Sequence, residues 1–375
     1  MGLKNSSRKC RRPDSGGQRE RERRVHRIVG LHRCADGRIQ RIWCGPQARS
    51  RRNPEIHRRP NSGNTERDER CPTERNERRS VHPGDDEGSS PHEISPLQEV
   101  VTMAEPYSLA GKHVLITGAG SGIGRLMALG AARRGATRLV LWDLNLPAAK
   151  AVATEVEALG ASAHAMTVDV SKKSAVTTAA TKVLAKSGHL DVLINNAGVV
   201  VGKNFLELEE KDVSLTYSVN TFALYWTIQA FLPSMLERDT GRLVTIASAA
   251  GLAGSSRLTD YAGSKHAAVG FMESLRAELR DAGSSVSALT VNPFYINTGM
   301  FDGVKSGSPL LPIQDQDEAT AKILDAVEST KRELLLPGMV YSVRVFRLLP
   351  TALFDWIADA FGINKAMKTF RGRRT

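Results

Sequence analysis

The sequence has few cysteines and no long uninterrupted apolar run. Its four cysteines, Cys10, Cys34, Cys44 and Cys71, lie early in the chain, and none has the close CxxC spacing of a zinc knuckle. A fold built on disulfides or structural zinc is therefore not expected, and we expect no metal site. The most apolar stretch, residues 339–363, is interrupted before about 20 apolar residues accumulate, so a membrane-spanning helix is not expected either.

The first 102 residues also lack apolar runs, apart from "VHRIVGLH" and "IQRIW". They contain 21 Arg and 2 Lys against 15 Asp or Glu, which gives a net charge of +8 out of +12 for the whole chain. Such a segment cannot bury enough apolar surface to offset the entropy that is lost on ordering. Residues 1–102 are therefore predicted to be a disordered basic segment.

Three interpretations of this segment stay open: a basic arm that binds nucleic acid, a solvated tail, or upstream sequence wrongly joined to the protein. Its acidic stretch "GDDEGSSPHE" and its single aromatic residue, Trp43, disfavour the first, so we expect no nucleic-acid partner. Met103 opens "MAEPYSLAGKHVLITGAG", a natural domain start, and we favour a misassigned start. No apolar segment of signal-peptide form follows Met1 or Met103.

After Met103, short runs rich in Val, Ile and Leu alternate with stretches of helical periodicity. Continuous apolar runs indicate parallel strands that are buried on both faces, with helical crossovers between them. The pattern predicts the α/β class, with a single Rossmann-type doubly wound parallel sheet of about seven strands. We assign residues 103–338 to this domain and residues 339–375 to a C-terminal amphipathic helical tail.

The glycine cluster "TGAGSGIG" follows the first predicted strand and leads into an amphipathic helix. In that context Gly118 permits a tight turn, Gly122 lets the backbone approach a pyrophosphate, and Gly124 lets the helix pack closely on the strand. The free N–H groups at the start of the helix face the phosphate charge. The cluster predicts a dinucleotide site, and Ser121 and Ile123 are expected to contact the cofactor with the glycines.

Asp143 ends the second predicted strand, nineteen residues after Gly124. An acid at this place binds the adenosine ribose hydroxyls and repels a 2′-phosphate, so we expect NAD rather than NADP. The alternative is that Asp143 caps the following helix, and one residue can serve both purposes.

Two further strand ends lie at the same edge of the predicted sheet. Asp169 and Val170 are expected to border the adenine. Asn196, Ala197 and Gly198 of "NNAG" follow the fourth strand, at the topological switch point where open sheets bind ligands. A polar turn is the alternative reading of the asparagines.

Tyr261 and Lys265 are four residues apart at the start of a predicted helix, and Ser248 ends the strand before it. Residues four apart lie on one helical face. A phenol has a pKa of about 10, and lowering it to about 7 requires roughly 4 kcal/mol. A nearby ammonium and an oxidised nicotinamide favour the phenolate, so Tyr261 is expected to transfer a proton and Ser248 to bind the substrate oxygen. Alternatively, this spacing is incidental and Ser248 is a cap.

"TGAGSGIG", "NNAG", the strand-end serine and "YAGSK" together resemble the short-chain dehydrogenase/reductase family, from about Leu109 to about Pro337. The resemblance implies that Ser248, Tyr261 and Lys265 are catalytic and that Lys265 also holds the nicotinamide ribose. It further implies that Asn220 in "YSVNTFALYW" holds a water in a proton relay. A polar residue that kinks a helix is the alternative for Asn220.

The loop after the sixth strand departs from the family pattern. "NPFYINTGM" keeps Thr298, which the resemblance assigns to the cofactor, but has Phe294 where the family usually has glycine. Phe294 and Tyr295 are expected to contact the substrate. This loop and the C-terminal sequence resemble the subgroup of retinol and 17-β-hydroxysteroid dehydrogenases, which implies a lipophilic alcohol or carbonyl substrate.

The resemblance thus implies an oxidoreductase that forms a homodimer or homotetramer, and Asp143 leads us to expect that it uses NAD. An NADP-dependent carbonyl reductase is the enzymatic alternative. The non-enzymatic alternative is a nucleotide-binding interaction protein with a vestigial site. The intact Ser248, Tyr261 and Lys265 disfavour it. We expect a cytoplasmic protein whose C-terminal tail either lies on a membrane surface, with Arg344 and Arg347 as anchors, or packs on the domain or a second subunit.

Overall fold

The computed structural model of the chain describes residues 31–33, 39–41, 106–306 and 311–372. Leu31–Arg33 (β1) and Ile39–Arg41 (β2) pair as a two-stranded antiparallel sheet. The rest of segment 1–102 and the favoured start at Met103 lie outside the described residues. Disorder in that segment and the position of the start therefore stay predictions.

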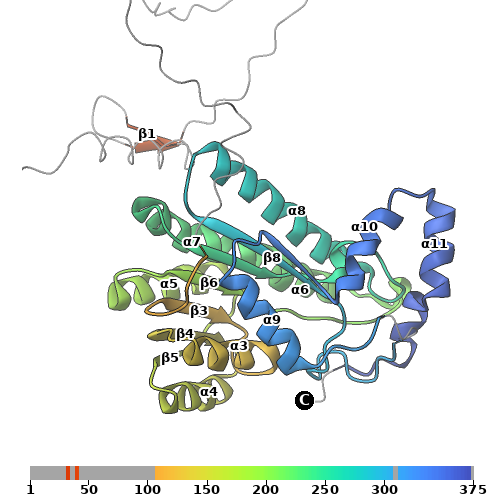
Figure 1. Cartoon of the computed structure of the whole chain (residues 1–375), viewed down its shortest axis with the longest axis horizontal. Helices are drawn as coiled ribbons and strands as arrows, with labels where there is room; N and C mark the ends of the chain where they lie inside the picture. Colours follow the sequence, from red (N-terminus) through yellow and green to blue (C-terminus); the bar gives the residue numbers. More distant parts are fainter. Residues whose placement is uncertain (1–30, 34–38, 42–105, 307–310, 373–375) are drawn as a thin grey trace, which may run out of the picture. The chain divides into compact units, whose positions relative to one another are not determined.

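The domain is built on a parallel sheet, as the alternating pattern predicts. Among the described residues the sheet has seven strands in the order β5-β4-β3-β6-β7-β8-β9 (Figure 1). The order reverses direction between β3 and β6, which places a topological switch point there. The strands are β3 (His113–Thr117), β4 (Arg138–Asp143), β5 (Ser162–Thr167), β6 (Val192–Asn195), β7 (Arg242–Ile246), β8 (Ser287–Pro293) and β9 (Glu333–Leu336).

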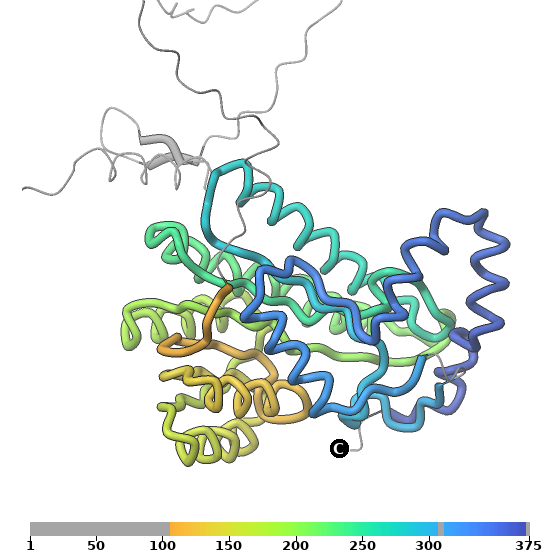
Figure 2. Tube along the Cα trace, viewed as in Figure 1, coloured from red at the N-terminus to blue at the C-terminus, as the bar shows by residue number. Residues whose placement is uncertain are grey.

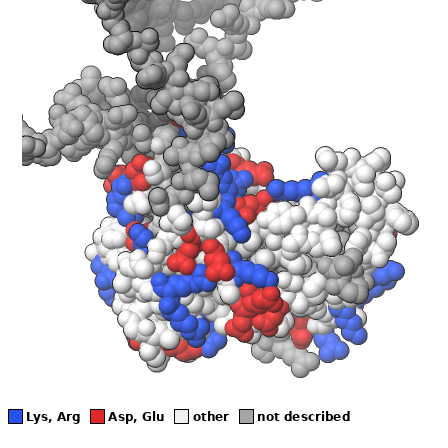
Figure 3. All heavy atoms as spheres, in the orientation of Figure 1, with Lys and Arg blue, Asp and Glu red and all other residues white. Residues whose placement is uncertain are grey.

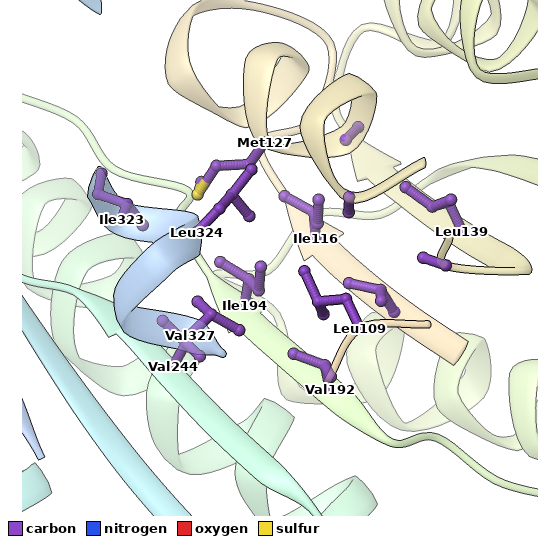
Figure 4. Packing of buried hydrophobic residues seen from close by; sticks show 14 of the residues in the cluster. Leu109, Ile116, Met127, Leu139, Val192, Ile194, Val244, Ile323, Leu324 and Val327 are labelled. Atoms are coloured by element: carbon purple, nitrogen blue, oxygen red, sulfur yellow. The ribbon is translucent and has the colours of Figure 1, made fainter. Parts of the chain in front are cut away.

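Helices cover both faces of the sheet. One face carries α3 (Gly122–Arg133), α4 (Leu146–Ala158) and α9 (Gln316–Val327), and the other carries α5 (Lys173–Ser187), α7 (Ala223–Arg238) and α8 (Thr259–Asp281). In Figure 4, Met127 of α3 and Leu324 of α9 lie over the side chains of Ile116 and Ile194. Strands covered on both sides read as continuous apolar runs, which explains why the sequence pattern located them.

Some strands end earlier than the apolar runs in the sequence indicate. β7 stops at Ile246, so Ser248 lies two residues beyond the strand and precedes the 3₁₀ turn η3 (Ala249–Gly251). β5 stops at Thr167, so Asp169 and Val170 belong to the loop before α5. These residues lie at the carboxyl edge of the sheet because parallel strands all end on the same side.

After β9 the chain forms a series of short helices. These are η4 (Gly338–Tyr341), α10 (Ser342–Phe346), α11 (Thr351–Ala360) and η5 (Ile363–Thr369). Figure 2 shows α10 and α11 as an arm that stands away from the sheet, and η5 returns to the domain. Ser255 Oγ donates to Ile363 O at 3.1 Å and holds that return. Within the described ranges no helix has the length and apolar character needed to span a bilayer.

Candidate active site

The carboxyl ends of the strands surround a cavity of about 920 Å³. It lies at the switch point between β3 and β6, where the sequence predicts a ligand. Ser248 lines it, together with every residue that we expected to bind the cofactor: Gly118, Ser121, Gly122, Ile123, Gly124, Asp143, Asp169, Val170, Asn196, Ala197, Gly198, Tyr261, Lys265 and Thr298.

The glycine turn between β3 and α3 leaves the wall of this cavity bare of side chains. Gly118 and Gly122 have φ values of +64° and +55°, a region that other residues rarely adopt. A Cβ on Gly124 would overlap Gly118 O, so the helix packs against the turn as predicted. Asn196 Nδ2 donates to Thr117 O at 2.9 Å and to Gly118 O at 3.1 Å. The Asn196 side chain therefore holds the turn in place.

Asp143 is fixed at the cavity edge by backbone donors. Its Oδ2 accepts from Gly120 N at 2.8 Å and its Oδ1 from Asn145 N at 2.9 Å. The helix cap is Asn145, whose side chain accepts from Ala148 N, so the capping alternative for Asp143 is wrong. Gly120, which the sequence argument passed over, is needed here because its Cβ would lie 2.9 Å from Asp143 Oδ2.

Asp169 is also held by local bonds. Its Oδ1 accepts from Ser171 N at 3.1 Å and from Ser171 Oγ at 2.6 Å, and Lys172 lies 3.3 Å from its Oδ2. Burial opposes ionisation, but these bonds hold the pKa of Asp169 below its ordinary value. The carboxylate is therefore charged and fixed, next to the buried Val170.

Tyr261 and Lys265 lie on the first turns of α8 and both are buried. Lys265 Nζ is 5.7 Å from the centroid of the Tyr261 ring and donates to Ile246 O at 2.9 Å. A Cβ on Gly198 would lie 3.7 Å from Lys265 Nζ, so the segment that follows β6 passes close to the same amine. The structure thus brings together the Tyr–Lys pair and the "NNAG" strand end.

We expected a nearby ammonium and an oxidised nicotinamide to lower the pKa of the Tyr261 phenol. Without the cofactor, the pKa of this phenol is raised. In the protein alone, burial raises the pKa of Tyr261 to about 12, although a hydrogen bond with Ser248 acts in the opposite direction. Burial lowers the pKa of Lys265 to about 8. Desolvation disfavours both charged forms, so the ammonium by itself does not make the phenol acidic.

Ser248 has two hydrogen-bond partners besides Tyr261. Its Oγ accepts from Ala250 N at 3.1 Å and reaches Pro293 O at 3.5 Å. The first bond caps η3, so the alternative reading of Ser248 as a cap holds alongside its place in the cavity wall.

Asn220 lies behind the cavity wall, in a π-helical turn (η2, Ser218–Phe222) between α6 (Glu210–Tyr217) and α7. Its side chain exchanges hydrogen bonds of 2.9 and 3.0 Å with the backbone N and O of Val199. Its Nδ2 also donates to Ser264 Oγ at 3.0 Å, and Ser264 donates to Tyr261 O at 2.7 Å. Asn220 is thus both in a distorted helix, as the alternative reading has it, and linked to the turn that carries Tyr261.

A second, smaller cavity of about 50 Å³ adjoins the first and shares Ser248, Tyr261, Phe294 and Phe301 with it. Tyr295 contributes to this cavity, and burial and the nearby Tyr261 raise the pKa of its phenol. The sequence argument missed most of the other lining residues, because small and aliphatic side chains from distant segments look like ordinary core. They are Ala249, Ala250, Ala253, Ser255, Leu258, Leu311, Val340, Val343 and Ile363.

Comparison with known proteins adds to this geometry. Residues 112–308 match the family described as short chain dehydrogenase. Epidermal retinol dehydrogenase 2 of Homo sapiens is 42% identical over 267 residues, which cover 70% of this chain and 86% of that protein. Estradiol 17-beta-dehydrogenase 11 of Mus musculus is 38% identical over 260 residues, which cover 68% of this chain and 86% of that protein.

Solved structures have the same fold. A short chain dehydrogenase/reductase from Burkholderia phymatum in complex with NAD gives a TM-score of 0.54 at 29% identity, covering 64% of this chain and 95% of that one. A metagenomic short-chain oxidoreductase in complex with NADP gives a TM-score of 0.52 at 30% identity, covering 60% of this chain and 96% of that one.

Proposed function

The chain belongs to the short-chain dehydrogenase/reductase family and is an oxidoreductase of alcohols and carbonyls; from this premise we propose that it oxidises a lipophilic alcohol with NAD, using Tyr261 as the base. The observation that carries the proposal is the position of Tyr261. It lies in the wall shared by the large polar-edged cavity and the small apolar one, with Lys265 beside its ring.

The larger cavity fits a dinucleotide. Its volume of about 920 Å³ is at the upper end of the range of about 300–1,000 Å³ for ligand pockets. Bound NAD supplies the hydride acceptor. Gly118 and Gly122 leave backbone exposed where a pyrophosphate approaches, and the start of α3 presents free N–H groups to it.

Asp143 supports NAD over NADP. Backbone donors hold both of its oxygens at the cavity edge, so the carboxylate cannot easily turn away from a ligand. A 2′-phosphate there would meet a like charge, whereas ribose hydroxyls would donate to it. The family alone gives no preference, because its solved members include complexes with either dinucleotide.

Ser248 and Tyr261 act on the substrate hydroxyl, and Lys265 and Asn220 support Tyr261. Ser248 Oγ donates to the substrate oxygen and orients it, and the proton of that hydroxyl passes to Tyr261 Oη as the carbon–hydrogen bond breaks. Lys265 keeps positive charge close to the phenol, since a pKa of about 8 leaves most of its amine protonated at neutral pH. Asn220 holds the α8 turn in position through Ser264.

The small cavity supports an apolar substrate. Phe294, Tyr295 and Phe301 form a group of edge-packed rings beside Tyr261, with aliphatic residues opposite. Relatives at 38 to 42% identity are named retinol and estradiol dehydrogenases. Val340, Val343 and Ile363 of the C-terminal segment form part of the wall that would contact such a substrate.

A turnover screen tests this function. The full chain is incubated with NAD or NADP and with retinoid, steroid and long-chain fatty alcohols, and dinucleotide reduction is followed. We expect turnover of at least one alcohol with NAD, slower with NADP, and a loss of at least about 100-fold in Tyr261→Phe with NAD binding retained. Unchanged turnover in Tyr261→Phe would rule out the proposed base.

A further inference from the structure

Four polar side chains lie in the wall of the small cavity: Ser248, Ser255, Tyr261 and Tyr295. Three of them already have hydrogen-bond partners. Ser255 Oγ donates to Ile363 O at 3.1 Å, and Ser248 and Tyr261 are hydrogen-bonded to each other. Ser248 and Tyr261 also act on the reacting hydroxyl in the proposed function. The hydroxyl of Tyr295 is the polar side-chain group of this wall that remains.

The Tyr295 side chain is buried, with 7% of the residue exposed, and its hydroxyl has no hydrogen-bond partner within residues 106–306 and 311–372. Unlike the unpartnered Nε1 of Trp142 in the core, this oxygen is not fully enclosed by protein atoms, so it opens on the cavity that the ring lines. Buried polar groups are nearly always paired, and each exception requires an explanation. A ligand that pairs with the hydroxyl provides one.

Packing restrains the ring that carries this hydroxyl. Phe294 packs against the Tyr295 ring edge-on, with ring centroids 4.6 Å apart, and Phe301 does so at 5.0 Å. On the backbone, Tyr295 O accepts from Gln314 N at 2.8 Å, which ties the loop after β8 to the segment before α9. A polar group that is held in place before the ligand arrives loses little freedom on binding, so it can contribute to specificity.

The Tyr295 phenol is neutral at pH 7 and can donate a hydrogen bond. Burial and the nearby Tyr261 raise its pKa above the ordinary value, so it keeps its proton. A neutral phenol donates to an oxygen acceptor, whereas a phenolate only accepts. The free hydroxyl therefore suits a ligand oxygen.

The surroundings indicate that this ligand oxygen is uncharged. Within the described ranges no charged side chain lines the small cavity. Val343 of α10 forms part of the wall, and Figure 3 shows the lobe formed by α10 and α11 as largely free of charged atoms on the face in view. Burying a carboxylate without a charged partner is costly. A carbonyl, hydroxyl or ether oxygen is the group that fits.

Tyr295 lies apart from the phenol that carries out the chemistry. Phe301 packs edge-on against both tyrosine rings, at 5.9 Å from Tyr261 and 5.0 Å from Tyr295. The two phenols come from different elements, the start of α8 and the loop after β8, and in the described structure they are not hydrogen-bonded to each other. A ligand that contacts both phenols therefore lies along the Phe301 ring and carries oxygen at two places.

We propose that Tyr295 determines specificity, its hydroxyl donating a hydrogen bond to a second, neutral oxygen of the substrate. The substrate is then a lipophilic alcohol with a further carbonyl, hydroxyl or ether group away from the carbon that is oxidised. This inference rests on the proposed function and adds the second contact to it. An analogue without the second oxygen leaves the buried hydroxyl unpaired, so such a contact discriminates strongly between substrates.

Matched pairs of alcohols test the second contact. Each pair has one carbon skeleton, with and without a further oxygen: retinol and its ring-oxidised ketone, a steroid alcohol with and without a ketone at the far end of the ring system, and a long-chain fatty alcohol and the corresponding α,ω-diol. In the full chain with NAD, we expect kcat/KM to be at least about tenfold higher for the oxygenated member of at least one pair. That pair identifies the skeleton. Equal kcat/KM within every pair would overturn the proposal.

Tyr295→Phe removes the hydroxyl and keeps the ring. The preference within the selected pair should fall by at least about tenfold, mainly through a higher KM for the oxygenated alcohol, since the contact is made in the ground state and the transition state alike. The matched control is Tyr225→Phe, a 39% exposed tyrosine of α7 outside both cavities, which should keep the preference.

Two results with Tyr295→Phe would contradict the assignment. A preference that the variant retains would show that another group binds the second oxygen. An equal loss of kcat/KM for both members of the pair would place the Tyr295 hydroxyl at the reacting oxygen.

Binding to a chain that lacks turnover separates this inference from the proposed function. With NAD bound, Tyr261→Phe should still bind the oxygenated alcohol at least about tenfold more tightly than its partner in calorimetric titration, and adding Tyr295→Phe should remove that difference. Selective binding without turnover of any alcohol by the unchanged chain would keep the second contact and remove the proposed function. Turnover without selectivity would do the reverse.

Discussion

The amine of Lys265 lies 5.7 Å from the ring centroid of Tyr261 and donates a hydrogen bond to Ile246 O, at the end of β7. The bond fixes the amine between the strand end and the phenol. Because both groups are buried, the pKa of Tyr261 rises to about 12 and that of Lys265 falls to about 8. The pair is thus held in place before any ligand binds, at a cost in stability.

That cost predicts that Lys265→Met stabilises the ligand-free protein while removing turnover. A lysine with a lowered folded pKa destabilises the fold at pH values below that pKa, and the cost disappears as the pH rises past the unfolded value of 10.5. Burial therefore costs up to about 3 kcal/mol near neutral pH. Urea unfolding should show a gain for Lys265→Met at pH 7 that shrinks by pH 9.5. A variant less stable than the unchanged chain at both pH values would contradict this.

Asp143→Ser should shift the dinucleotide preference. Removing the carboxylate removes the repulsion of a 2′-phosphate, so the Kd for NADP should fall by at least about tenfold and that for NAD should rise. Calorimetric titration with both dinucleotides measures the change. An unchanged ratio of the two Kd values would mean that Asp143 does not face the ribose.

Gly124→Ala should abolish dinucleotide binding, since the added Cβ overlaps Gly118 O and displaces the turn. The control is Gly270→Ala, also within a helix, where the added Cβ meets nothing within 4 Å. That control should bind NAD normally and gain up to about 1 kcal/mol from helix propensity. Equal NAD affinity of both variants would show that the turn does not hold the cofactor.

Val343→Trp should discriminate between substrates by size. The larger side chain fills the small cavity, so KM for a long-chain alcohol should rise by at least about tenfold while a short alcohol is oxidised at the normal rate. Steady-state kinetics with both alcohols provide the measurement. Equal effects on both would place the substrate elsewhere.

Much of the fold follows from the sequence because its strands are buried on both faces. Runs such as those of β3 and β6 are continuous in Val, Leu and Ile, and their parallel arrangement brings all their carboxyl ends to one edge. Once this edge is identified, the sequence alone predicts that the glycine turn, Asp143 and Tyr261 lie close together. The expected cofactor residues all line one cavity for this reason.

The substrate side was less predictable. Val340, Val343 and Ile363 come from short helices whose arrangement depends on tertiary contacts such as the bond from Ser255 to Ile363 O. Their side chains have no feature that separates a cavity wall from a core. The exposure of α11 was equally hidden, because its apolar pattern is compatible with packing on the domain or on a surface.

The protonation state of Tyr261 in the NAD complex shows whether the bound dinucleotide turns this phenol into a base. Phenolate absorbance is measured at pH 9, with and without NAD, as the difference between the unchanged chain and Tyr261→Phe. With a ligand-free pKa of about 12, Tyr261 should be neutral at that pH, and NAD should bring out its phenolate signal by lowering the pKa by at least about 3 units. A difference spectrum that NAD leaves unchanged would mean that Tyr261 stays protonated in the complex and is not the base.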